Sequence, residues 1–322
     1  MCIMNLEALS KELLVALRGR HPQQRISRKL GYRSNIVYRW ETGRCAPSAD
    51  KFFAFVDACG GDMRRALGTF FGDGATLPKP LAAPRAVGEI LARLRGKLEI
   101  SELARQMGRS RFVVSRWLDG TTQLRLPELL LFIEQSTLRL LDFLAALVPP
   151  ERLPSARSAW AALEASRRAA FDHPWSHAVL RVLETSAYKR LKAHKLGWIA
   201  ARLGLSIEEE EACVSVLREA QQIRIRHGRY VVCDTRPVDV RGQDDKRDAL
   251  RAFWMRVAAD RHARGVPGIY GFNLFSVSAL DYEKIQAMQR AHFEAVRHVI
   301  AESRPEERVV LMATQIVPLD CG

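Results

Sequence analysis

The spacing of apolar residues predicts a chain built mostly of helices. In the first sixty residues, apolar side chains recur every three or four positions, which places them on one face of a helix. Glycines interrupt this pattern at points where a left-handed turn would end a helix. The pattern predicts four helices, over residues 9–18, 24–30, 35–42 and 49–59.

The same pattern returns 77 residues later. The stretch "GYRSNIVYRWETG" begins at Gly31, and "GRSRFVVSRWLDG" begins at Gly108. Between residues 12 and 57, twelve of 46 positions are identical to the residue 77 places further on, without a gap. Many of the other pairs, such as Leu30 with Met107 and Ile36 with Val113, exchange one apolar residue for another. We therefore interpret the N-terminal half as two copies of one helical module.

The third predicted helix of each copy has an inward and an outward face. In the first copy, Ile36, Val37 and Trp40 fall on the face that is expected to pack inward. Ser34 is expected to cap this helix, since serine is a favoured N-cap residue. Trp40 and Trp117 could serve as stacking platforms, but their spacing from the preceding valine favours a place in the core.

A helix, a glycine turn and a second helix form the helix-turn-helix arrangement. The sequence resembles the repressor-type (Cro-like) helix-turn-helix modules of phage and bacterial transcription regulators, because "RWETGRCAPS" carries their apolar–Glu–x–Gly step and Pro-containing loop. The second copy departs from this pattern, since Leu118 replaces the glutamate and the proline moves to position 127. The resemblance implies that the third helix of each copy enters the major groove of DNA.

The resemblance also implies which side chains contact DNA. Arginine can donate two hydrogen bonds to a guanine edge and asparagine can pair with adenine, whereas Phe112 could only touch a thymine methyl group. Arg39 and Arg116 could instead contact only phosphate or water. The expected DNA-contacting residues are Arg33, Ser34, Asn35, Tyr38, Arg39 and Arg44 in the first copy and Ser110, Arg111, Phe112, Ser115 and Arg116 in the second.

The second half of the chain begins with a different pattern. Helices are expected over residues 155–171, 244–262 and 280–302, and a β-hairpin is expected to turn at His227 and Gly228. The elements that lead into this hairpin resemble a winged helix. Its would-be reading helix begins with four glutamates, at 208–211, which suit a helix N-terminus but would repel phosphate. We therefore expect this unit to be structural or dimer-forming, although basic residues on the wing, Arg224, Arg226 and Arg229, could touch the DNA backbone.

Two segments of β-strand composition, 268–278 and 308–319, flank the last helix and predict a small α/β cap. The region from about residue 150 to residue 319 resembles a bacterial domain of unknown function whose members are regarded as transcription regulators. The resemblance implies a winged helix followed by a strand, a long helix and a strand. Free strand edges suit pairing between copies, so a homodimer is expected.

The charge of the chain suits an anionic partner. The 322 residues carry a net charge of +14, with +6 over residues 1–72, +3 over 73–150, +4 over 151–240 and +1 over 241–322. A basic balance of this kind most often indicates contact with nucleic acid or an anionic surface. The six cysteines include no CxxC pair, and the sequence has no recognisable export signal or membrane span. A bacterial cytoplasmic protein is therefore expected.

The sequence contains no recognisable catalytic constellation, so no enzyme activity, cofactor or metal site is expected. It has no Gly-rich phosphate loop and no GxSxG motif. His173 and His177 are four residues apart, but Pro174 is expected to begin a helix between them, and no further ligands complete a metal site. Two alternatives stay open: an interaction protein, such as an antitoxin or a defence-system component, and an enzyme whose site lies in the C-terminal region.

Together these patterns predict a mainly α protein with five parts. These are a helix-turn-helix module over 1–71, a Pro- and Ala-rich linker over 72–86, a second module over 87–148, a linker helix and winged-helix-like domain over 149–240, and an α/β cap over 241–322. Fully extended, the linker could span about 50 Å, at about 3.3 Å per residue, which would allow one module in each of two successive grooves. The expected function is a transcription regulator that binds double-stranded DNA sequence-specifically, with the C-terminal half serving dimerisation or signal sensing.

Overall fold

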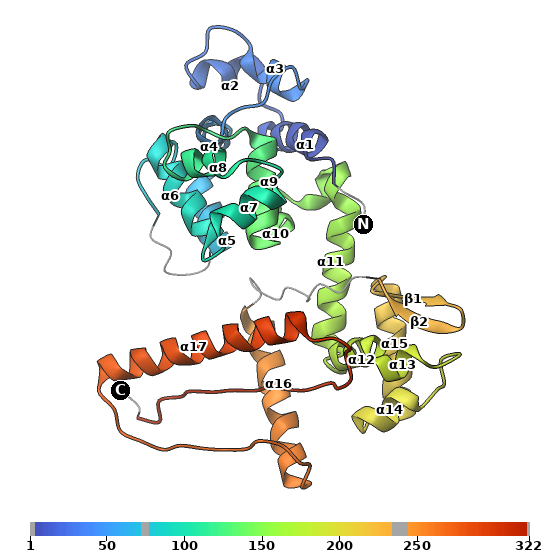
Figure 1. The fold of residues 1–322 in the computed structure, drawn as a ribbon. Coiled ribbons are helices and arrows are strands. Elements are labelled where there is room, and N and C mark those ends of the chain that lie inside the picture. The colour runs from blue at the N-terminus through green and yellow to red at the C-terminus, as the bar shows by residue number, and fades with distance from the viewer. Residues whose placement is uncertain (1–3, 72–76, 234–243, 321–322) are drawn as a thin grey trace. The chain divides into compact units, whose positions relative to one another are not determined.

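The computed structural model describes residues 4–71, 77–233 and 244–320 (Figure 1). These residues are mainly helical, as predicted, and their strands form one two-stranded sheet. The chain divides into two compact units, Met1–Glu164 and Ala165–Gly322. Among the described helices, none is both long enough and apolar enough to cross a lipid bilayer.

The first unit contains two sets of five helices that repeat along the chain. The first set comprises α1 (Leu6–Arg18), α2 (Gln23–Lys29), α3 (Ile36–Glu41), α4 (Ala49–Ala58) and α5 (Met63–Phe71). The second set comprises α6 (Pro84–Arg95), α7 (Ile100–Gln106), α8 (Arg111–Leu118), α9 (Leu126–Thr137) and α10 (Leu140–Leu147). A shift of 77 residues brings the first set onto the second to within a few residues at each helix end. The four helices predicted for the first copy are confirmed, their equivalents recur in the second copy, and the structure adds a fifth helix to each set.

The turn between the second and third helices of each set depends on a glycine. Gly31 has a φ of 82° and Gly108 has a φ of 63°, a left-handed backbone that residues with a Cβ rarely adopt. The sequence repeat is therefore also a repeat of backbone conformation.

The two sets pack against each other with approximate twofold symmetry. The backbone N–H of Ala49 donates to the carbonyl of Leu124 at 2.9 Å, and the N–H of Leu126 donates to the carbonyl of Pro47 at 2.9 Å. Residues 49 and 126 occupy equivalent positions in the two sets, and so do 47 and 124. Two hydrogen bonds exchanged between equivalent residues are typical of an isologous, dimer-like contact.

One hydrophobic core serves both sets, so the first unit is a single packed body. Trp40 and Trp117 are both buried in this core, as their spacing predicted. The equivalent helices α5 and α10 lie against each other, and the rings of Phe70 and Phe143 meet edge to face with centroids 5.8 Å apart.

The stretch between the two sets differs from the predicted spacer. Residues 72–76 of the expected linker lie outside the described residues. Leu77 and Leu81 are buried in the shared core, and α6 begins at Pro84, inside the expected linker. Docking of the two sets, rather than the reach of an extended linker, therefore fixes how far apart α3 and α8 lie.

Short helices and one hairpin open the second unit, and two long helices follow. After η1 (Pro150–Arg152), α11 (Pro154–Asp172) leads from the first unit into the second. The remaining elements are α12 (Trp175–Glu184), α13 (Ser186–Lys189), α14 (Trp198–Leu203), α15 (Ile207–Glu219), β1 (Ile223–Arg226), β2 (Arg229–Val232), α16 (Asp244–Ala263) and α17 (Ala279–Glu302). The hairpin turns at His227 and Gly228, both with positive φ, as the sequence predicted.

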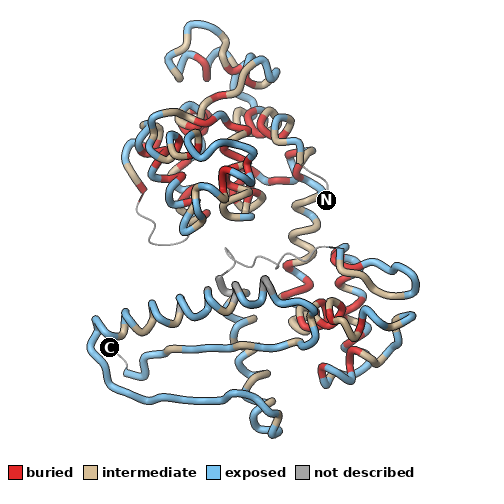
Figure 2. Tube along the Cα trace, viewed as in Figure 1, coloured by how far each residue is buried: buried red, intermediate tan, exposed pale blue. Residues whose placement is uncertain are grey.

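The prediction of a C-terminal α/β cap is wrong for the single chain. Residues 268–278 and 308–319 are extended but form no sheet within the described residues, and Figure 2 shows both segments almost entirely exposed. β-strand composition expresses a preference for a pleated, half-buried surface, and that surface requires a neighbouring strand. Within the described part of one chain, neither segment has one.

Candidate nucleic-acid interface

The outward face of α3 carries four of the predicted residues. Ser34, Tyr38 and Arg39 are exposed, and Asn35 is partly exposed. The helix cap differs from the prediction, because Asn35 rather than Ser34 occupies the N-cap position. Its Oδ1 accepts the backbone N–H of Tyr38 at 3.2 Å and the hydroxyl of Ser27 at 3.2 Å. The amide nitrogen of Asn35 is the part of this side chain that remains for an outside partner.

Two further arginines flank this face. Arg33 is exposed immediately before α3, and Arg44 is exposed just after it. The guanidinium of Arg44 lies 5.4 Å from the centre of the Tyr38 ring, a cation–π contact that draws Arg44 toward the α3 surface. The structure thus brings the six predicted residues of the first copy to one helix and its two flanks.

The equivalent face of α8 is less polar. Ser110 caps the helix, and its hydroxyl accepts the N–H of Val113 at 3.4 Å. Phe112 is 67% exposed, with the guanidinium of Arg111 stacked 5.0 Å from its ring centre. Arg116 is exposed, and the Ser115 hydroxyl lies 3.4 Å from Asp119. The structure therefore also brings the five predicted residues of the second copy to one helix.

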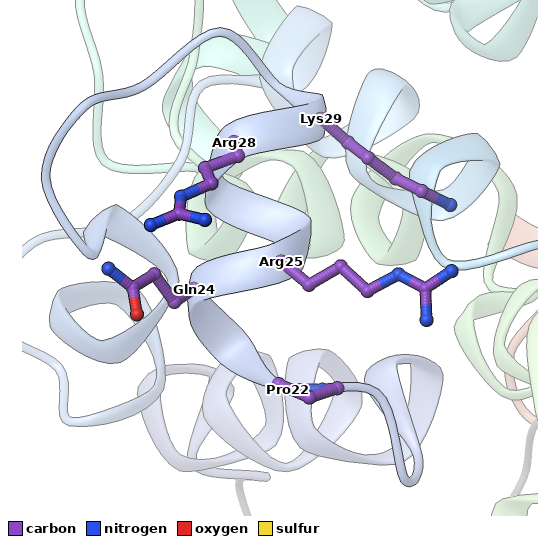
Figure 3. Close-up of a pocket in the computed structure, with 5 residues that line it drawn as sticks. All are labelled: Pro22, Gln24, Arg25, Arg28 and Lys29. Carbon is purple, nitrogen blue, oxygen red and sulfur yellow. The ribbon is translucent and has the colours of Figure 1, made fainter.

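The sequence reasoning missed a basic surface on α2. Pro22, Gln24, Arg25, Arg28 and Lys29 line an open hollow of about 580 Å³ (Figure 3). The three cations follow the exposed side of the helix, and Lys29 also donates to the carbonyl of Ala58 at 3.0 Å. The signal was present in the stretch "QQRISRK", where the two arginines and the lysine fall outside the apolar stripe.

The corresponding surface of α7 has no net positive charge. Glu102 stands where the first copy has Arg25, and it accepts two hydrogen bonds from Arg105, at 2.5 and 2.9 Å. The hydrogen bond from Arg105 holds the pKa of Glu102 below its usual value, so the carboxylate stays ionised. The first copy thus offers three cations on its second helix, whereas the second copy offers one arginine that is already paired.

A mostly buried polar network fixes α3 to the helices before it. Glu41, on α3, accepts two hydrogen bonds from Arg18, at 2.5 and 3.1 Å, and one from the amide of Gln23 at 2.5 Å. In the second copy, Leu118 replaces the glutamate, and the buried Nε of Arg95 has no partner. Glu41, which has no counterpart in the second copy, therefore links α1, α2 and α3 in the first copy.

The β1–β2 hairpin of the second unit also presents basic side chains. Arg224 and Arg226 are exposed on β1, and Arg229 is partly exposed on β2. The glutamate run on α15 does not form one repelling face, because Glu210 is fully buried and accepts the N–H of Ala200 at 2.6 Å. Its neighbour Glu209 completes a capping box at the start of α15.

Tyr188, His194 and Glu210 form a chain of polar contacts, in which Tyr188 and His194 share a hydrogen bond and His194 lies at ion-pair distance from Glu210. The Tyr188 hydroxyl accepts the N–H of Tyr230 at 3.2 Å, so its own proton is free to bond Nδ1 of His194, also at 3.2 Å. The histidine proton then belongs on Nε2, which lies 3.5 Å from Glu210 Oε1. Burial lowers the pKa of His194, which favours this neutral form, although Glu210 opposes the shift. The chain ties α13 and α15 to the hairpin and contains no serine or cysteine nucleophile.

Within the described residues, His173 and His177 belong to no metal-binding cluster, and the buried cysteines are poorly suited to act as nucleophiles. His173 lies before α12 and His177 within it, and no described group of three or more His, Cys, Asp or Glu side chains could hold a metal ion. Burial raises the pKa of the Cys59 and Cys213 thiols to about 11. Both thiols are therefore protonated at neutral pH, which makes them poor nucleophiles.

Comparison with protein families assigns the second half of the chain. The family described as Domain of unknown function (DUF4423) matches residues 155–319, which is more than half of the sequence, and the chain belongs to this family. The match leaves both five-helix sets outside its range. No curated protein and no solved structure matches the chain significantly.

Proposed function

We propose that the protein is a transcription regulator that binds double-stranded DNA sequence-specifically, with two helix-turn-helix modules formed around α2–α3 and α7–α8. The observation that carries this proposal is the approximate twofold relation between two exposed, arginine-bearing helices, α3 and α8. Regulators with a helix-turn-helix place one reading helix in each of two major grooves about 34 Å apart, and their symmetry mirrors that of the operator. In this proposal, the two sets of a single chain take the place of the two subunits of such a regulator.

In this proposal, the two modules have different roles in DNA binding. The first presents Arg33, Asn35 and Arg39 for base edges and the α2 cations for phosphate. The second presents Arg116 beside an apolar Phe112 and has a neutral α7 surface. The first module therefore specifies the operator, whereas the second contributes mainly affinity for the DNA backbone. The winged-helix-like elements of the second unit act structurally, with their wing arginines available for phosphate.

The test is competition binding of the full-length protein to its selected site and to a scrambled duplex. Arg39→Ala should weaken binding to the selected site by about 1–3 kcal/mol and leave the scrambled duplex nearly unaffected. Arg116→Ala should weaken both duplexes to a similar extent. Arg251→Ala, on α16, removes an exposed positive charge that is paired with Asp248 and serves as the control for net charge.

The salt dependence provides a second readout. The logarithm of the binding constant should fall steeply with the logarithm of salt concentration, by about 0.9 for each phosphate contacted. Binding that is equal at low and high salt would exclude the proposal. A larger loss of selectivity in Arg116→Ala than in Arg39→Ala would reverse the roles of the two modules.

A further inference from the structure

The C-terminal region exposes far more apolar surface than a single soluble chain normally does. Residues 268–278, α17 and residues 308–319 carry large apolar side chains that point into solvent. These are Ile269, Tyr270, Phe272, Leu274, Phe275, Val277, Leu280, Met288, Val299, Ile300, Val310, Leu311, Val317 and Leu319. Ile269 and Phe272 are essentially fully exposed, at 104% and 96%. Scattered apolar residues on a surface are normal, but two contiguous segments of them are not.

The area involved is enough for a stable interface. With on the order of 100 Å² exposed for each of these fourteen side chains, the region presents roughly 1,400 Å² of apolar surface, spread over two extended segments and one helix. A standard protein interface buries about 800 Å² from each partner. The exposed region could therefore supply the whole of one side of such an interface.

The backbone of the two extended segments is also unpaired. Within the described residues, neither 269–277 nor 309–317 forms a backbone hydrogen bond. Alternate side chains of an extended segment point to opposite faces, and in the first segment Tyr270, Phe272 and Leu274 share one face. A long, flat, apolar strand edge is a template for pairing with another strand.

The charge of this region suits an identical partner. Residues 241–322 carry a net charge of only +1, whereas residues 1–72 carry +6. Two copies of the C-terminal region would therefore meet without strong repulsion.

We propose that the protein is a homodimer in which the extended segments 268–278 and 308–319 of one copy form intermolecular β-structure with those of a second copy, and in which the exposed side of α17 packs into the same interface. The strands that the sequence predicts are strands of the dimer. This proposal is independent of DNA binding, because it concerns residues of the second unit and is tested without DNA.

The test measures the mass and the dissociation constant of the full-length protein by light scattering and sedimentation over a dilution series. The wild type should have twice the chain mass of 36.4 kDa at micromolar concentration. Phe272→Asp combined with Leu274→Asp should raise the dissociation constant about 100-fold or more, since each change occurs twice in a symmetric dimer and buried aromatic anchors dominate interfaces. The matched control is Asn273→Asp, which adds a charge between these two positions without removing an apolar group.

A second measurement tests the strand pairing itself. Backbone amides of 269–277 and 309–317 should exchange hydrogen slowly in the wild type and quickly in the double variant. Because Phe272 and Leu274 are exposed in the single chain, the variant should keep its helical circular dichroism. A wild-type monomer at all concentrations, or a double variant with an unchanged dissociation constant, would overturn the proposal and leave the surface to a different partner. Dimerisation with fast exchange in both segments would overturn the β-structure.

Discussion

A glycine on α6 allows α6 and α8 to touch backbone to backbone. A Cβ at Gly88 would stand 2.4 Å from the carbonyl oxygen of Leu118 and 3.0 Å from the backbone nitrogen of Gly120. The obstacle is main chain rather than a flexible side chain, so it cannot rotate away. In the first copy, Lys11 occupies the position of Gly88. The substitution Gly88→Ala should therefore force the C-terminal end of α8 away from α6.

The expected change in the free energy of unfolding of Gly88→Ala combines two opposing effects. Alanine in place of a helical glycine gains up to about 1 kcal/mol of helix stability. Overpacking a tight contact usually costs about 1–3 kcal/mol, and a 2.4 Å approach belongs at the upper end of that range. We expect a net loss of about 1–2 kcal/mol. For a unit of this size, each kcal/mol lowers the melting temperature by about 2–4 °C.

Gly68 provides the matched control. It lies inside α5, has an ordinary negative φ, and a Cβ there would meet nothing within 4 Å. Gly68→Ala should therefore stabilise the protein by about 0.5–1 kcal/mol. Calorimetry of the full-length variants measures both changes. If Gly88→Ala and Gly68→Ala changed the melting temperature in the same direction, the backbone contact between α6 and α8 would be refuted.

Two further predictions concern stability. Glu41→Leu, which copies the residue of the second set, should destabilise the protein by about 3 kcal/mol in urea unfolding, because it leaves a mostly buried arginine without its carboxylate. An unchanged urea midpoint would contradict this role for Glu41. Burial lowers the pKa of His177 from a usual value near 6.5 to about 4. Between these two pH values, the unfolded chain binds the proton more tightly than the folded chain does. The free energy of unfolding should therefore fall as the pH falls, by up to about 1.4 kcal/mol per pH unit. His177→Gln should flatten this part of the stability profile, and an equally steep profile in the variant would assign the effect to other groups.

The sequence predicted the repeated helices well because their signals are local. Apolar spacing and the two turn glycines are enough to place four helices in each set. The cap of α3 was less certain, because Ser34 and Asn35 are both good capping residues and the choice depends on the Ser27 hydroxyl, which arrives from α2. The reciprocal hydrogen bonds at 47–49 and 124–126 have no sequence signature, since they join backbone atoms. The docking of the two sets could therefore not be read from the residues.

The candidate site was predicted on α3 and α8 but not on α2. The resemblance to repressor-type modules concerns α3 and α8. Arg25, Arg28 and Lys29 form one basic surface only in the folded structure, where they line the same hollow. The structure of the C-terminal segments 268–278 and 308–319 was also not predictable from the sequence. Their composition predicted β-strands, but composition alone does not supply the neighbouring strand that a sheet requires, and the described residues of one chain contain none.

The joining of two modules in one chain explains why the copies can differ. In a dimer of identical chains, every substitution appears on both sides of the axis, so both reading helices must keep the same chemistry. Here each side can change alone. The first copy has Glu41 and a basic α2, whereas the second has a close backbone contact at Gly88, a leucine in place of the glutamate and no net positive charge on α7. Under the proposed function, these differences predict an operator with two unequal halves, in which one half is specified closely and the other is held mainly through its phosphates.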